Sequence, residues 1–157
     1  MKKIINPFVN NKNYSCFGCS PDNPGGLQME FFEEGDDVVC LWEPRDKFTG
    51  YGHILHGGVQ ATLMDEIASW VVFVKLKTAG FTTNINVDYK NQVLINKGNI
   101  IVRASLKEMK KNIAHVSVTL SDGEGKLGSE GIVQYFTLPE KIAVKKMAYP
   151  GIEGFYE

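Results

Sequence analysis

The sequence has few cysteines, no marked excess of charge of either sign and no long uncharged apolar run. Its 157 residues include three cysteines, an odd number that is too small for a disulfide framework. Cys16, Cys19 and Cys40 therefore predict a reducing, cytoplasmic setting. Seventeen Lys and Arg residues balance 18 Asp and Glu residues, giving a net charge of -1. Phosphate-directed nucleic-acid binding relies on a clear basic excess, so we expect no nucleic-acid partner.

Neither a membrane span nor a targeting segment is predicted. The longest apolar run, residues 59–76, contains Asp65, Glu66 and Lys75, and a membrane span would not usually carry three charges. The chain begins Met-Lys-Lys-Ile-Ile but then runs into asparagines and a proline, without the apolar core of a signal peptide. We expect a single soluble domain over residues 1–157.

The order of the predicted elements is strand, strand, helix and then four strands. Residues 1–26 are rich in Asn, Pro and Gly and are predicted to be irregular. Alternating apolar and polar residues predict a hairpin and four further strands, with turns at 33–36 and 122–125. The predicted strands are residues 27–31, 38–42, 82–89, 99–107, 113–120 and 127–138. The tail, residues 139–157, has no clear period.

The segment between the two groups of strands predicts a long helix. Twelve of the eighteen residues in 59–76 are apolar, and none is Gly or Pro. This run is too long for a strand, so we expect a helix over 58–78, with Gly80 as its C-terminal cap. A helix that is apolar on nearly every side should be buried on nearly every side. The predicted fold is therefore α+β, an antiparallel sheet of about six strands wrapped around one long buried helix. A β-sandwich is less favoured because it would leave this helix nowhere to be buried.

His56, Gly57 and Gly58 lie at the predicted helix start. A helix N-terminus has unpaired N–H groups and the positive end of the helix dipole, and glycines let another molecule approach the backbone closely. Such a site can bind a phosphate or a carbonyl oxygen that acquires negative charge. The alternative is structural, a tight turn into the helix with His56 packed against it.

Asp65 is the second candidate, because a carboxylate in an apolar buried helix costs free energy unless it is paired or functional. Thr62, Asp65 and Ser69 lie three and four residues apart and share one helix face, whereas Glu66 points about 100° away. Asp65 could equally hydrogen-bond Ser69 or cross a subunit interface. The helix start lies about 10 Å away along the axis, so in a symmetric dimer the acid of one subunit could face the helix start of the other.

These residues resemble a known family. His56-Gly57-Gly58 followed by Asp65 is similar to the HGG-(x)6-D motif of hotdog-fold acyl-CoA thioesterases of the phenylacetate-pathway type. Residues 16–27, Cys-Phe-Gly-Cys-Ser-Pro-Asp-Asn-Pro-Gly-Gly-Leu, resemble the entry segment of the thioesterase superfamily member 4 group. Residues 82–90 resemble that group's third strand. The resemblance covers residues 16–138 and implies the hotdog fold.

The resemblance also implies hydrolysis of an acyl-CoA in a site between two subunits of a dimer or tetramer. Gly57 N–H, with His56 nearby, would polarise the thioester carbonyl. Asp65 would attack it or activate a water that Thr82 helps to position. No cofactor and no metal are implied. The expected substrate contacts are Gly58, Thr62, Ser69, Asn84 and Lys90.

One departure leaves other functions open. Many relatives have an asparagine shortly before HGG, and residues 47–55 contain none. A hotdog protein that binds an acyl thioester without hydrolysing it is therefore the main alternative, and a dehydratase or hydratase using His56 and Asp65 is the third. Glu66 is the less favoured choice of acid, because the motif spacing selects Asp65. Cys16 and Cys19 have the spacing of half a zinc site, but without a second pair they are interpreted as free thiols.

Overall fold

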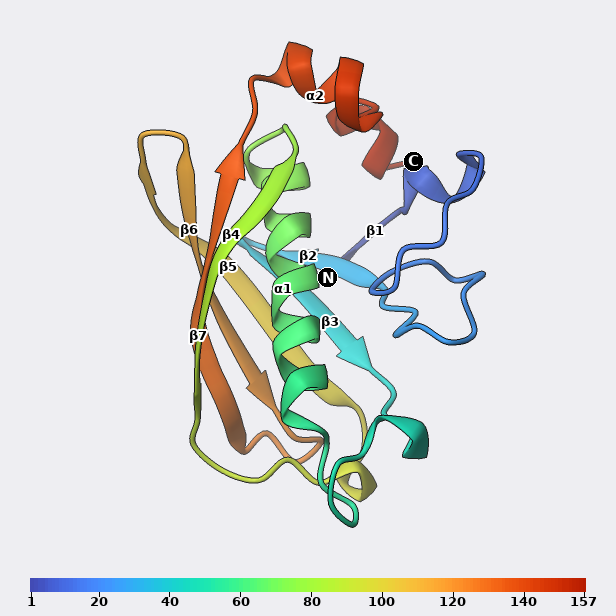
Figure 1. Ribbon diagram of the computed structural model, residues 1–157, viewed down its shortest axis with the longest axis vertical. Helices are drawn as coiled ribbons and strands as arrows, with labels where there is room; N and C mark the ends of the chain where they lie inside the picture. The colour runs from blue at the N-terminus through green and yellow to red at the C-terminus, as the bar shows by residue number, and fades with distance from the viewer.

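A computed structural model describes residues 1–157 as one antiparallel sheet with a long helix against it (Figure 1). There are seven strands and two α-helices. The strands are β1 (Lys2–Ile4), β2 (Phe31–Glu34), β3 (Asp37–Trp42), β4 (Gly80–Tyr89), β5 (Ile100–Lys110), β6 (Ile113–Ser121) and β7 (Leu127–Thr137). The helices are α1 (Gly57–Lys75) and α2 (Glu140–Met147). Neither helix is both long and apolar enough to cross a membrane.

The sheet confirms the predicted hotdog arrangement of antiparallel strands and one long helix. Its strand order is β1-β2-β3-β5-β6-β7-β4, so β1 and β4 are the two edges. As the alternation in the sequence predicts, every second side chain along most of β5 and β6 is buried: Ile100, Val102, Ala104, Ala114, Val116, Val118 and Leu120. The seventh strand, β1, was not predicted, because three residues beside an Asn- and Pro-rich segment carry no periodic signal.

The first predicted strand is shifted along the chain. It begins at Phe31 and not at Leu27, because the N–H groups of Leu27 and Met29 bind the N-terminal segment, at 2.7 Å to Phe17 O and 2.9 Å to Gly18 O. The predicted hairpin between β2 and β3 is confirmed, with Glu34 opposite Asp37.

The helix α1 is close to its predicted extent, but its C-terminal end was predicted wrongly. It ends at Lys75, and the left-handed residue that follows is Lys77, with φ 56°. Gly80 is not a helix cap but the first residue of β4. A Cβ atom there would lie 1.8 Å from Phe136 O on β7, so the close approach of the two strands requires glycine.

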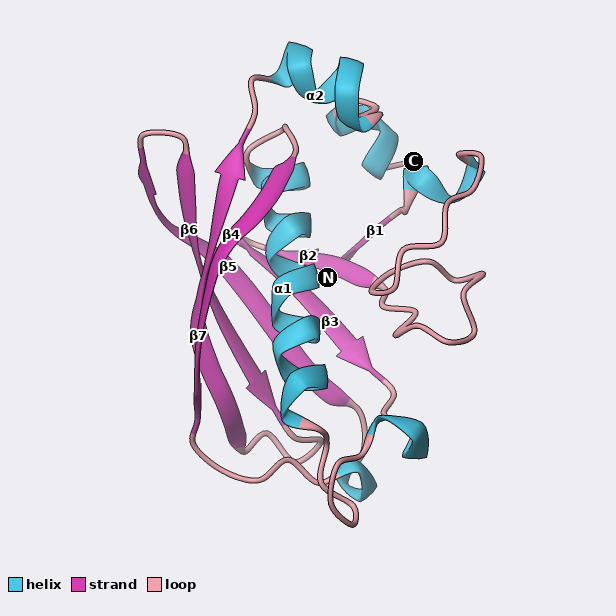
Figure 2. Ribbon diagram, in the orientation of Figure 1, coloured by secondary structure: helices cyan, strands magenta, loops and turns pink.

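Residues 61–75 of α1 are all buried or partly buried, which confirms the expectation of burial on nearly every side. The sheet covers the face that carries Leu63, Ile67 and Val71, which are fully buried. Asp65 and Glu66, which lie off this face, are partly buried, and Ser69 and Trp70, one turn further along, are buried. Figure 2 shows strand β1 and the loops of the N-terminal segment on the side of α1 away from β4 and β7.

A register shift in β4 corrects the predicted faces of this strand. Strict alternation over residues 82–89 predicts Thr82 and Asn84 on one face and Ile85 and Tyr89 on the other. The pairing with β7 shifts between Thr82 and Asn84, so Thr82 is on the same inward face as Ile85 and Tyr89. Asn84, opposite Gln134, is on the outward face. A β-bulge inserts one residue into a strand and reverses the alternation beyond it.

The C-terminal tail folds back onto α1. Phe155 is fully buried, and its ring lies 5.7 Å from that of Trp70 and 5.6 Å from that of Phe73. The hydroxyl of Tyr156 donates to Glu33 on β2 at 3.1 Å. The short helix α2, which leads into this region, was not predicted, because residues 139–157 show no clear hydrophobic period.

Substitutions at Gly80 separate steric contact from helix capping. Gly80→Ala and Gly80→Asn should both lower the free energy of unfolding by about 2–3 kcal/mol, because any Cβ collides with Phe136 O. Urea denaturation measures this, with Gly25→Ala as the control, since a Cβ at Gly25 meets only Asn23 Oδ1 at 3.5 Å. A stable Gly80→Asn protein would instead support the capping role, because asparagine tolerates a left-handed cap.

Candidate active site

The start of α1 is closed by the side chain of His56. His56 is the N-cap, and its Nδ1 accepts a hydrogen bond from Gly58 N at 2.9 Å. A Cβ at Gly58 would lie 3.0 Å from His56 Cε1, so glycine makes room for the imidazole ring. His56 and Gly58 thus form one capping unit, and the Gly58 amide is occupied within the chain.

Two amides of the first helical turn have no hydrogen-bond partner in the chain, those of Gly57 and Val59. Beside them is a groove of about 390 Å³, whose lining includes Gly57, Tyr89 and Lys90. Tyr89 OH donates to Gly57 O at 2.6 Å and ties β4 to the helix start. Free N–H groups at the positive end of a helix, next to a lysine, can bind an anionic oxygen.

Asp65 lies two turns further along α1 and is itself partly exposed. Thr82 Oγ1 donates to Asp65 Oδ1 at 2.6 Å. This contact depends on the β-bulge, since without the register shift Thr82 would point away from the helix. Both residues line a cavity of about 330 Å³. A carboxylate held in this way, with its second oxygen not bonded to Thr82, can act as a base or a nucleophile.

Thr62 and Ser69 do share the helix face of Asp65, but their hydroxyls bind the helix backbone. Thr62 Oγ1 donates to Gly58 O at 2.9 Å, and Ser69 Oγ donates to Glu66 O at 2.6 Å. Ser69 nevertheless lines the same cavity as Asp65. The outward face of β4 keeps Asn84 away from this cavity.

The predicted site residues therefore form two groups in the monomer. His56, Gly57, Gly58 and Lys90 surround the helix start, whereas Asp65, Thr82 and Ser69 line the cavity. No residue lines both hollows. Eight residues of helix, or roughly 12 Å, separate Gly57 from Asp65.

The cavity of Asp65 also contains residues that the sequence did not identify as part of the site. Its lining includes Tyr14, Cys16, Cys19 and Glu66. The Sγ atom of Cys16 lies 3.5 Å from Glu66 Oε1, and Tyr14 OH lies 2.8 Å from Cys19 Sγ. The Cys-x-x-Cys spacing was the only signal of this cluster, because the sequence does not reveal that Glu66 packs against it.

Burial and mutual hydrogen bonding change the acidity of this cluster. Burial raises the pKa of Glu66 to about 7. A hydrogen bond from Cys19 holds the pKa of Cys16 below its ordinary value, and the same bond raises that of Cys19. Burial also raises the pKa of Tyr14.

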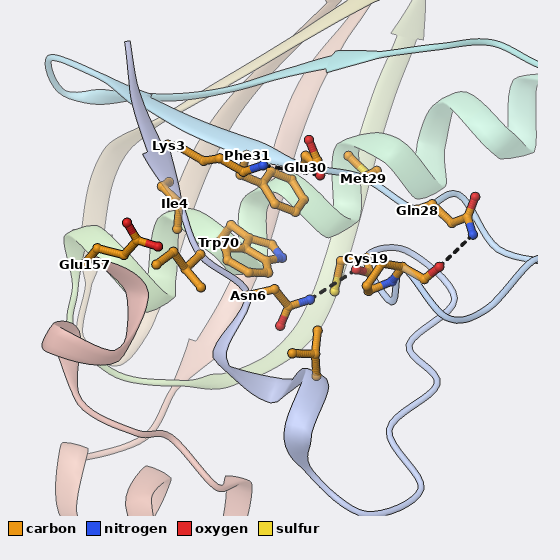
Figure 3. Close-up of a pocket in the computed structure, with 13 residues that line it drawn as sticks. Lys3, Ile4, Asn6, Cys19, Gln28, Met29, Glu30, Phe31, Trp70 and Glu157 are labelled. Atoms are coloured by element: carbon orange, nitrogen blue, oxygen red, sulfur yellow. Dashed lines mark hydrogen bonds and ion pairs between the residues drawn. The ribbon is translucent and has the colours of Figure 1, made fainter.

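A larger cavity, of about 570 Å³, lies beside this cluster (Figure 3). The ring of Trp70 stacks on Phe31 with their centroids 4.4 Å apart, and Asn6 Nδ2 donates to Cys19 O at 3.1 Å. None of the predicted site residues lines this cavity. It has no acid paired with a hydroxyl and no free helix terminus, so the chemistry favours the smaller cavity.

The fold and the paired Asp65 and Thr82 define a hotdog protein with a candidate acid–base site, and the comparisons with known proteins identify its family. A model of the thioesterase superfamily matches residues 52–129. A Thermoplasma acidophilum protein that is named as an esterase is 32% identical over 113 residues, which are 70% of this chain and 82% of its own. Acyl-coenzyme A thioesterase 13 of Homo sapiens is 28% identical over 96 residues, 60% of this chain and 68% of its own. The chain belongs to the thioesterase superfamily.

Solved structures agree with this family. Thioesterase superfamily member 2 of zebra fish has a TM-score of 0.62 and 26% identity, covering 74% of this chain and 89% of its own. A Streptococcus mutans protein bound to acetyl CoA has a TM-score of 0.66 over 83% of this chain and 98% of its own. At 16% identity, the second likeness shows the fold alone.

The capping role of His56 predicts a graded effect on stability. His56→Ala should lower the free energy of unfolding by about 1 kcal/mol, whereas His56→Asn should retain most of it, because asparagine is a strong N-cap. Urea denaturation of both variants measures the difference. Equal losses in the two variants would show that His56 stabilises the helix start by packing and not by capping.

Proposed function

We propose that this protein is an acyl-CoA thioesterase that hydrolyses a thioester to the free acid and CoA. The observation that carries the proposal is the Asp65 carboxylate, which Thr82 holds at 2.6 Å on the wall of a cavity. Membership of the thioesterase superfamily and the name of the human relative support the same reaction. Bound acetyl CoA in the Streptococcus mutans structure is consistent with a CoA ester as the substrate.

In this proposal the two groups of residues have different roles. Gly57 N–H polarises the thioester carbonyl and stabilises the oxyanion, while the imidazole of His56 keeps the helix start in shape. Asp65 attacks the carbonyl or activates a water, with Thr82 orienting the carboxylate. Of the expected substrate contacts, Gly58, Thr62 and Ser69 act through the shape of α1, and Lys90 binds CoA phosphate. Asn84 has no role in this proposal, because it lies on the outward face of β4.

The two halves of the site require two subunits. Within one chain the free amide of Gly57 and the acid Asp65 line different hollows. Edge strand β4 is ten residues long, and its exposed residues include Phe81, Ile85 and Tyr89. An exposed apolar edge of this length favours pairing with a second chain. A two-fold dimer through β4 would set the Asp65 of one subunit against the helix start of its partner.

Asp65→Asn tests the acid. This variant keeps the shape and the hydrogen bond from Thr82 but loses the charge, so kcat should fall by about 10²–10⁴-fold while the fold is retained. The assay follows free CoA with a thiol reagent across short, long and aromatic acyl-CoAs. Asp36→Asn, an exposed turn carboxylate, is the matched control.

Two results would contradict the enzymatic proposal. Near wild-type turnover in Asp65→Asn would remove this residue from the mechanism. Tight binding of acyl-CoA by the wild-type chain without release of CoA from any substrate would support the non-catalytic alternative, a protein that binds or senses acyl thioesters.

Gly57→Pro tests the oxyanion donor without disturbing the helix. Proline is favoured at the first helical position, and His56, with φ -56° and ψ 132°, already has the conformation that a following proline requires. The variant removes the N–H and adds the three ring carbons of proline, and kcat should fall by about 10²–10³-fold. Gly57→Ala keeps the N–H, and its Cβ would lie 3.5 Å from the Tyr89 ring, an ordinary contact. Equal activity of the two variants would exclude the Gly57 amide.

A further inference from the structure

Three potential metal ligands meet between the N-terminal segment and α1. The sulfur atoms of Cys16 and Cys19 and a carboxylate oxygen of Glu66 all lie within 4.8 Å of one another. Two thiolates on one tetrahedral zinc ion lie about 3.8 Å apart, because each Zn–S bond is about 2.3 Å long. The cluster therefore needs to contract by no more than about 1 Å to hold one ion.

The backbone brings the two cysteines and the carboxylate together closely. Ser20 N donates to Cys16 O at 3.1 Å and closes a tight turn over residues 16–20. A Cβ at Gly18 would lie 2.4 Å from Glu66 Cδ, so only glycine allows this turn to contact the carboxylate. The turn is also held from the other side, since Asn6 Nδ2 donates to Cys19 O at 3.1 Å (Figure 3).

Two of the three ligand groups, Cys19 and Glu66, have a hydrogen-bond donor arranged for their anionic form. Tyr14 OH, which accepts from Asn6 Nδ2 at 3.1 Å, has its own proton free for Cys19 Sγ. Trp70 Nε1 donates to Glu66 Oε1 at 3.2 Å. Metal ligands are typically oriented by partners of this kind.

The residue after the second cysteine has an unsatisfied polar side chain. Ser20 is fully buried, and its hydroxyl is the one buried side-chain polar atom in residues 1–157 without a hydrogen-bond partner. A buried hydroxyl of this kind calls for a water molecule or an ion nearby. The polar groups of the turn are therefore incompletely satisfied by the protein alone.

We propose that Cys16, Cys19 and Glu66 form a zinc site that fastens the N-terminal segment to α1 beside Asp65. Two thiolates and a carboxylate are zinc ligands, and three protein ligands leave the fourth position for water. Cys16, Cys19 and Glu66 line the same cavity as Asp65 and Thr82, so that position is accessible from the cavity. Binding releases the protons of the two thiols. The ion thereby fixes one wall of the cavity.

Metal titration of the full chain tests the site. The protein is kept reduced with a phosphine, and a chelator removes any bound metal. The chelator is then removed, and the protein is titrated with Co²⁺. We expect a thiolate-to-cobalt charge-transfer absorption that saturates at one equivalent, and Zn²⁺ should displace the Co²⁺. Zn²⁺ should also raise the thermal unfolding midpoint, because a ligand that binds the folded state stabilises it.

Variants separate this site from other thiols and from the catalytic acid. Glu66→Gln and Cys16→Ala should each weaken Zn²⁺ binding by at least about 100-fold. Loss of a residue that only orients a metal ligand costs up to about 100-fold, so a larger loss indicates a direct ligand. Cys40→Ala, which removes the buried thiol outside the cluster, and Asp65→Asn should bind Zn²⁺ as the wild type does. If Cys16→Ala fails to fold, the Zn²⁺ affinity of Glu66→Gln and the cobalt spectrum of the wild type still test the zinc site.

Three outcomes would overturn the proposal. The first is a Co²⁺ complex without thiolate charge transfer. The second is unchanged Zn²⁺ affinity in Glu66→Gln and Cys16→Ala. The third is a reduced wild-type chain that binds no Zn²⁺ but forms a Cys16–Cys19 disulfide in air, which would make the cluster a thiol pair.

Discussion

The packing of α1 on one face of the sheet is the constraint on which the rest of the structure depends. It buries Leu63, Ile67 and Val71 against the strands and leaves Asp65 and Glu66 on the face that the sheet does not cover. Burial of apolar area is the main favourable term in folding. The acid can therefore remain on this helix because the helix is stabilised by its other side. The uncovered face is where the cavity and the N-terminal segment meet.

The sequence predicted the fold and the position of the candidate acid Asp65 on the long helix, but not its contact with Thr82. Periodicity identifies α1 and the strands, since each exposes one face and buries the other. It does not detect the β-bulge, and it therefore placed Thr82 on the wrong face of β4. Gly80 was misread for a related reason, because a glycine needed for close strand approach looks like a helix cap in the sequence. The contact between Glu66 and the cysteines joins residues 50 positions apart, and no local pattern reports it.

The N-terminal segment has a larger part in the site than its irregular composition suggests. It supplies Tyr14, Cys16 and Cys19 to the cavity and covers the part of α1 that the sheet leaves open. The chain thus builds its candidate site from a rigid helix, an edge strand and a loop. Loops that carry functional groups are commonly positioned by such a rigid scaffold. A zinc ion in the cysteine cluster would give this loop the order that its sequence does not supply.

The central claim is that Gly57 and Asp65 act together across two subunits, and a mixed dimer tests it most directly. Asp65→Asn and Gly57→Pro chains with different affinity tags are co-expressed, and the mixed dimer is purified by both tags. A site shared between subunits leaves one of the two sites intact, so the account predicts about half of the wild-type activity per dimer from two inactive parents. A mixed dimer as inactive as its parents would contradict the account.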